Sequence, residues 1–165
     1  MPNLQNADLQ NQNLRKALSL AIDREDFAQN VLKDGSVEAN GFVPEDLSKG
    51  PNGEDFREDA NDFTTYDANA AQEALNQALQ ELGKSEVTLR LLYGTDESPM
   101  DTMATYLQNA FTKLDGLNIE MVATDQNRIV STTKKANGDF DLACTRWGTR
   151  LWRSDYVFIL NEDRQ

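Results

Sequence analysis

Three short apolar segments, separated by two helical ones, restrict what this chain can fold into more than any other feature. Apolar residues alternate along 87–93, 117–123 and 139–147, which is the period of a strand with one buried face. The intervening stretches 98–116 and 125–136 carry apolar residues at helical spacing. Helical crossovers of this length require parallel strands and right-handed connections. The pattern therefore predicts an α/β domain of three layers, in which a mainly parallel sheet is flanked by helices.

Two further helices are expected earlier in the chain. The first covers 13–32, where apolar residues keep helical spacing until Asp34-Gly35 stops the helix. The second covers 67–82, with Asp67 as its N-cap and Gly83 as its end. Its apolar stripe is rich in alanine, which would allow it to pack closely on the sheet.

Two segments lack any hydrophobic period. Residues 1–12 are rich in Asn and Gln, and we expect a flexible lead-in there. Residues 36–66 form a long connection that is punctuated by Gly and Pro and rich in acidic residues. Its acidic spacing does not match an EF-hand, so an acidic, solvated surface loop is favoured over a calcium site. A loop of this length would wrap the surface or face a partner.

Charge and composition exclude several classes of function. The 165 residues carry 28 acidic and 16 basic side chains, a formal net charge of −12, which would repel phosphate backbones and anionic membranes. We therefore expect no nucleic-acid partner. The chain has no histidine and one cysteine, Cys144, which removes disulfide frameworks, zinc sites and histidine-based triads. No phosphate loop, nucleophile elbow or Walker motif is present, so we expect neither catalysis nor a cofactor. The first ten residues are polar, so we expect no signal peptide among them.

Candidate functional residues stand where the predicted strands end, because open parallel sheets bind ligands at the carboxyl ends of their strands. Asp96 and Asp125 follow two of the strands and could hold magnesium, as in phosphoacceptor domains. The alternative function is therefore an intracellular α/β regulatory domain with a metal or phosphoacceptor site at these two residues. Both also precede helices, where a carboxylate serves as a cap, and the cap interpretation is favoured. Trp147 and Gly148 end the last strand and offer an aromatic wall and a close backbone approach. A tryptophan packed under a helix would explain Trp147 equally well.

The helix that follows Asp96 is expected to begin with Ser98 as its N-cap and Pro99 at its first position. In the last strand, alternation places Phe140, Leu142 and Cys144 on one face. A lone cysteine in such a pattern is typical of a small core residue.

Three segments in order resemble the extracellular oligopeptide-binding proteins of ABC transporters. They are NLRKALSLAIDREDFAQNVLKDGSVEANGFVP at 13–44, YDANAAQEALNQALQELG at 66–83 and DFDLACTRWG at 139–148. The resemblance implies a periplasmic-binding-protein type II fold, with 1–165 as a single, C-terminal lobe of a two-lobed receptor that encloses an extended peptide. It implies a non-enzymatic, extracellular protein with three partners: the oligopeptide, the remaining lobe and a membrane permease. A lipoprotein N-terminus, absent from this chain, would anchor it.

The same resemblance implies which residues face the peptide. In the family, the strand that ends in Trp-Gly pairs with the peptide main chain, which assigns this role to Arg146, Trp147 and Gly148, and the predicted site continues through Thr149 and Arg150. Family members place aspartates shortly after this strand, and the first commonly pairs with the peptide amino terminus. Here Arg150 and Arg153 stand at those positions. An arginine would repel an amino terminus and attract a carboxylate, so we expect an altered anchor.

Overall fold

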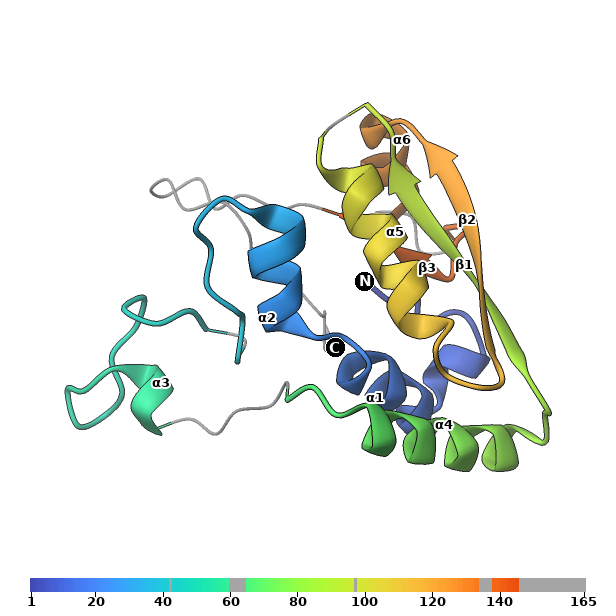
Figure 1. Ribbon diagram of the computed structural model, residues 1–165, viewed down its shortest axis with the longest axis horizontal. Coiled ribbons are helices and arrows are strands. Elements are labelled where there is room, and N and C mark those ends of the chain that lie inside the picture. The colour runs from blue at the N-terminus through green and yellow to red at the C-terminus, as the bar shows by residue number, and fades with distance from the viewer. Residues whose placement is uncertain (42, 60–64, 97, 134–137, 146–165) are drawn as a thin grey trace.

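The sheet of the protein has three parallel strands and lies along one side of the molecule (Figure 1). The computed structural model describes residues 1–41, 43–59, 65–96, 98–133 and 138–145. The strands are β1 (Val87–Gly94), β2 (Leu117–Thr124) and β3 (Leu142–Ala143), in the spatial order β2–β1–β3. The predicted fold class is confirmed, since the sheet is parallel and flanked by helices.

The two neighbours of β1 differ in length. Along β2 the pairing runs from Val87 opposite Leu117 to Gly94 opposite Thr124, whereas β3 pairs with β1 at two positions only. The predicted strand over 139–147 is therefore too long at its beginning. The chain bends at Asp139 and at Asp141, and for this reason the prediction that Phe140 shares a face with Leu142 and Cys144 is wrong.

Helices pack on both faces of the sheet, although among the described residues the second face is covered only near the carboxyl ends of the strands. On one face, α5 (Met100–Phe111) packs against β1 and β2, and its buried side chains join the main core. On the other, α6 (Gln126–Thr133) lies near the carboxyl ends of β1 and β2 (Figure 1). The fully buried Ile129 of α6 joins Leu92, Phe140 and Ala143 in a second, smaller cluster. The three predicted layers are thus present.

The predicted helix over 13–32 is broken in the structure. It consists of α1 (Gln12–Leu20), a short α2 (Arg24–Asp26) and a π-helical segment η2 (Phe27–Leu32). The Asp23 carboxylate accepts the Asp26 N–H at 3.0 Å and restarts the helix, while Arg24 donates to the carbonyls of Ser19 (3.2 Å) and Ile22 (3.1 Å). Periodicity did not reveal the break, because apolar residues keep helical spacing on both sides of it.

Helix α4 (Ala68–Leu82) has the predicted ends. Asp67 accepts the Ala70 N–H at 2.9 Å, and Gly83 closes the helix in the left-handed conformation at φ 65°. Its alanine stripe, however, packs along α1 and not on the sheet (Figure 1). Small side chains permit close approach to any surface, so the stripe alone did not specify which one.

Helix α5 begins one residue later than predicted. Pro99 is its N-cap with non-helical angles (φ −101°, ψ 33°), and no side-chain cap bond is present, so the prediction of Ser98 as the N-cap is wrong.

Residues 1–12 are built into the fold, which corrects the expected lead-in. Pro2 forms an antiparallel bridge with Leu142, and the Ala143 N–H donates to the Met1 carbonyl at 2.8 Å. Leu9, in the short 3₁₀ helix η1 (Asp8–Gln10), is fully buried in the main core. Because residues 1–6 are held by residues 138–143, more than 130 residues away, no local pattern could reveal this pairing.

The described part of the long acidic connection extends away from the sheet (Figure 1). It contains a short helix α3 (Phe56–Asp59), and the Asp55 carboxylate accepts the backbone N–H groups of Asp46 (2.6 Å) and Arg57 (2.7 Å). Most of its residues are exposed. Among the helices that the structure describes, none has the length and apolar character needed to cross a membrane.

Candidate functional site

The carboxyl ends of the strands form the edge at which a parallel sheet binds its ligands. Beyond β1 and β2, the Thr95 N–H donates to the Thr124 carbonyl at 2.9 Å and holds the two strand ends together. Beyond β3, the Cys144 N–H donates to the Leu92 carbonyl at 2.8 Å, and Thr145 follows half-buried. The chain therefore leaves β3 at this edge, at residue 145.

The five predicted peptide-facing residues come directly after this point. Arg146, Trp147, Gly148, Thr149 and Arg150 lie outside the described residues, as does Arg153. What the structure shows is the segment that leads to them, residues 138–145, and how that segment is held.

The two carboxylates of the alternative magnesium site are at the same edge. Asp96 and Asp125 are both exposed there. The Asp125 carboxylate accepts the Arg128 N–H at 2.8 Å, so its interpretation as a helix cap is confirmed. The same interpretation is wrong for Asp96, because the N-cap of α5 is Pro99. Nowhere in the described part of the chain do three or more His, Cys, Asp or Glu side chains gather in a way that could hold a metal ion.

Asp141 is the one charged residue that the fold buries within the described ranges, with 7% of its surface exposed. Its carboxylate accepts the Arg90 backbone N–H (2.8 Å), the Arg90 Nε–H (3.1 Å) and the Asn6 amide (2.8 Å). The Arg90 Nη1 also contacts the exposed Asp139 at 2.7 Å. One arginine thus ties β1 to two carboxylates that precede β3.

These contacts decide the charge of the cluster. Burial opposes ionisation of Asp141, but the hydrogen bonds from Arg90 and Asn6 outweigh it and hold the pKa of the carboxyl below its ordinary value. The hydrogen bonds that Arg90 makes to Asp141 and to Asp139 raise the pKa of Arg90. The pair is therefore ionised at neutral pH, as a buried carboxylate must be paired to remain stable.

Cys144 is a core residue, which confirms the prediction. It is 2% exposed, and burial raises the pKa of its thiol to about 11. At neutral pH the thiol is protonated, so it acts as a small apolar side chain and not as a nucleophile.

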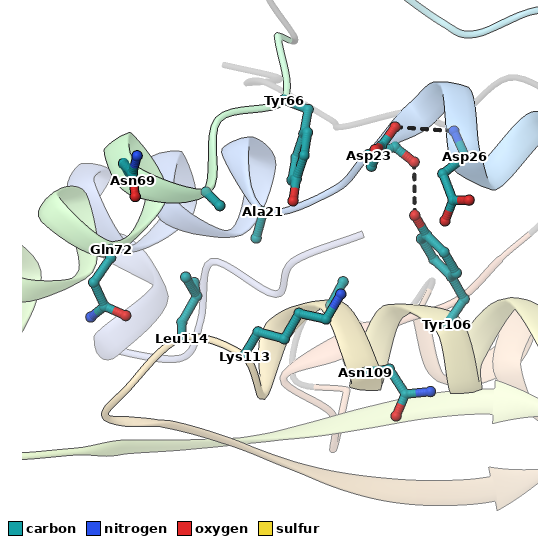
Figure 2. A pocket seen from close by; sticks show the side chains of 12 residues that line it. Ala21, Asp23, Asp26, Tyr66, Asn69, Gln72, Tyr106, Asn109, Lys113 and Leu114 are labelled. Carbon is teal, nitrogen blue, oxygen red and sulfur yellow. Dashed lines mark hydrogen bonds between the residues drawn. The ribbon is translucent and has the colours of Figure 1, made fainter.

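A cavity of about 380 Å³ lies elsewhere, between the α1–α2 corner, the start of α4 and the second half of α5 (Figure 2). Its lining is mixed polar and apolar: Ala21, Asp23, Asp26, Tyr66, Ala68, Asn69, Gln72, Tyr106, Asn109, Ala110, Lys113 and Leu114. Tyr66 extends toward it from the segment before α4, and Tyr106 reaches from α5 toward Asp23 and Asp26 (Figure 2).

One polar group of this cavity, the Tyr106 hydroxyl, joins α5 to the residue that caps α2. The Tyr106 hydroxyl donates to the Asp23 carbonyl at 2.9 Å, and its ring meets Phe27 edge-on with the centroids 5.2 Å apart. Burial, reinforced by the carboxylate of Asp26, raises the pKa of Tyr106. The end of α5 leads into the start of β2, so the cavity lies toward the amino ends of the strands. The sequence did not predict it, because its walls come from three distant segments.

The chain belongs to the bacterial extracellular solute-binding proteins, family 5, whose middle-region model matches residues 1–163. It is 34% identical over 148 residues to a dipeptide-binding protein of Lactococcus lactis, a match that covers 89% of this chain and 26% of that protein. The chain thus spans about a quarter of this curated relative's length.

Solved structures agree with this assignment. A peptide-binding protein of a peptide ABC transporter superposes with a TM-score of 0.82 at 31% identity, over 90% of this chain and 66% of the other. OppA of Listeria monocytogenes bound to peptide gives a TM-score of 0.74 at 30% identity, over 86% of this chain and 28% of the other.

Proposed function

We propose that this chain is a lobe of the substrate-binding component of a peptide ABC transporter, which binds extended oligopeptides and delivers them to a membrane permease. The observation that carries the proposal is the likeness, at 31% identity and a TM-score of 0.82, to a peptide-binding protein of a peptide ABC transporter. The peptide in the Listeria OppA structure supports the choice of ligand. The remaining lobe of the receptor and the permease are the proposed protein partners.

The proposed receptor is extracellular, in keeping with the name of its family. A lipoprotein N-terminus outside this chain would hold it at the membrane. The protein would act by binding alone, without catalysis or a cofactor.

The proposed peptide-facing edge is the segment that follows β3: Arg146, Trp147, Gly148, Thr149 and Arg150. Main-chain pairing along a strand gives affinity that does not depend on peptide sequence, and Trp147 would add an apolar wall. Support for this placement comes from β3, which ends at the ligand-binding edge of a parallel sheet.

A titration followed by NMR tests the proposal. The ¹⁵N-labelled chain receives a random hexapeptide pool up to about 1 mM, because one lobe of a closing receptor should bind weakly. We expect saturating shifts at residues 145–150, and their loss in Trp147→Ala. The amino acids of the pool, unlinked and at equal concentration, are the control. Shifts that are absent, or equal with free amino acids, would overturn the proposed function.

The arginines after the strand predict an altered end preference. With Arg150 and Arg153 in place of acidic residues, N-acetylated peptides should bind at least as well as peptides with a free amine. Paired titrations with the two forms of one hexapeptide measure this. A strong preference for the free amine would contradict the altered anchor.

A further inference from the structure

The Asp141 carboxylate occupies a position in the β1–β3 ladder that a backbone carbonyl would normally fill. Alternate residues of a strand direct their backbone groups to the same side, so Arg90 and Leu92 both face β3. The Leu92 carbonyl accepts the Cys144 N–H at 2.8 Å. Two residues earlier, the Arg90 N–H donates instead to the Asp141 side chain, also at 2.8 Å. The first rung of the ladder is therefore made by a side chain.

A carboxylate in that position accepts more bonds than a carbonyl in the ladder would. Besides the Arg90 N–H, Asp141 accepts from the Arg90 guanidinium and from Asn6. Its own carbonyl accepts the Asn3 N–H at 2.8 Å, and the Asn3 amide donates to the carbonyls of Gly138 (3.1 Å) and Phe140 (2.8 Å). Asp141 is thus fixed from β1 on one side and from residues 3–6 on the other.

This arrangement permits one alignment of β3. Slipping the strand by one residue would turn its buried side chains to the opposite face, and slipping it by two would move every residue about 6.6 Å along β1. Either shift would separate a buried carboxylate from its cation and from two N–H donors, which is strongly unfavourable. Leu142 and Ala143 alone form two rungs, which would specify the alignment poorly.

We infer that the Asp141–Arg90 pair sets the register of β3 against β1 and thereby fixes where the chain leaves β3, at Cys144 and Thr145, directly before the proposed peptide-facing residues. Both are positioning residues: neither is among the proposed peptide contacts. The peptide part of this inference rests on the proposed function. The register part rests on the described contacts.

Two variants and a matched control test the inference. Asp141→Asn removes the charge and keeps the size of the side chain. Arg90→Lys keeps the positive charge but loses the planar fork that reaches both aspartates, and it provides a milder change should the first variant fold poorly. Asp8→Asn is the control, because Asp8 forms an ion pair of similar length, 2.7 Å, with Lys84, and neither residue belongs to the β1–β3 ladder.

The first readout is hydrogen exchange in the chain without peptide. The amides of Ala143 and Cys144 donate to Met1 and Leu92, so a loosened register should expose them. The internal reference is the amide of Leu89, which lies in the β1–β2 pairing. In both variants, the ratio of the exchange rate at Ala143 and Cys144 to the rate at Leu89 should rise at least about tenfold above the wild-type ratio. The control should leave the ratio unchanged. Uniform acceleration along all three strands would show mere destabilisation and would overturn the inference.

The second readout is the apparent dissociation constant for the random hexapeptide pool, measured on the folded protein. A misplaced edge should weaken binding about tenfold in Asp141→Asn and less in Arg90→Lys, whereas Asp8→Asn should stay within about twofold. Equal affinity in all four proteins would overturn the positioning role. If the wild type binds no peptide, the proposed function fails, and the exchange ratio still decides whether the pair sets the register.

Discussion

Replacing Gly116 by alanine should destabilise the protein far more than the same change at Gly83. Both glycines have positive φ, +93° and +65°, so either alanine would adopt a conformation that L residues avoid. A Cβ at Gly83 would meet nothing within 4 Å. At Gly116 it would lie 2.8 Å from Leu79 Cδ1 and 3.3 Å from the Ser85 carbonyl oxygen. The two alanine variants would therefore differ chiefly in the steric contacts of the added Cβ atom.

The magnitude follows from these distances. The left-handed conformation costs about 1 kcal/mol at Gly83, near the lower end of the usual range, because its φ is close to the left-handed minimum. At Gly116 the φ is less favourable, and Leu79 must leave its rotamer, which adds roughly 1 kcal/mol. The Gly116 carbonyl also accepts the Val87 N–H at 2.9 Å at the start of the β1–β2 pairing. We expect a total loss of about 2–3 kcal/mol for Gly116→Ala.

Urea unfolding followed by circular dichroism measures both losses, provided that the m values of the variants agree. Leu79→Ala offers a further control: in that background the Gly116→Ala penalty should fall toward that of Gly83→Ala. Equal penalties for the two glycine variants, or an undiminished penalty without the Leu79 side chain, would refute the steric reasoning.

Three further predictions concern individual groups. The buried Cys144 should resist a thiol reagent at pH 8 while the urea-unfolded chain reacts fully; equal rates would contradict its burial. Tyr106→Phe should lower the unfolding free energy by about 0.5–1.5 kcal/mol, because it removes the 2.9 Å bond to the Asp23 carbonyl; an unchanged urea midpoint would count against that bond. The depressed pKa of Asp141 means that its stabilisation is present above about pH 4, the unfolded pKa, and is lost as the pH falls through the folded one. Urea midpoints between pH 3 and 6 should therefore fall less steeply in Asp141→Asn than in the wild type, and parallel slopes would contradict this.

The alternation of strand and helix was predictable because it is local. Each of β1, β2, α4 and α5 shows its period within about a dozen residues, and the parallel arrangement follows from the length of the crossovers. The side-chain caps at Asp67 and Asp125 were equally readable, whereas the one predicted at Ser98 is absent. These parts of the fold follow from neighbouring residues and do not require knowledge of distant ones.

The features that the sequence did not reveal depend on partners far along the chain. Residues 1–3 pair with β3 across nearly the whole length of the sequence, and Asp141 meets Arg90 across 51 residues. The corner at Asp23 and Arg24 is local, but its polar contacts left the apolar period intact and so hid the break. At the candidate site, the location at a strand end was predictable, whereas the means by which the strand is held in register was not.

The residues that carry the family resemblance within the described chain mainly build the frame. Asp23 and Arg24 close the corner between α1 and α2, Gly83 ends α4, and Asp141 holds β3 in place. None of these contacts selects a ligand, so they build the architecture without fixing what is bound. We therefore place selectivity in the proposed peptide-facing residues beyond Thr145, where the family resemblance implies acidic residues and this chain has Arg150 and Arg153. Suppose that the architecture is shared and that the charge at the anchor for the peptide amino terminus is reversed. Main-chain recognition of peptides would then be preserved, but the favoured end of the peptide would change.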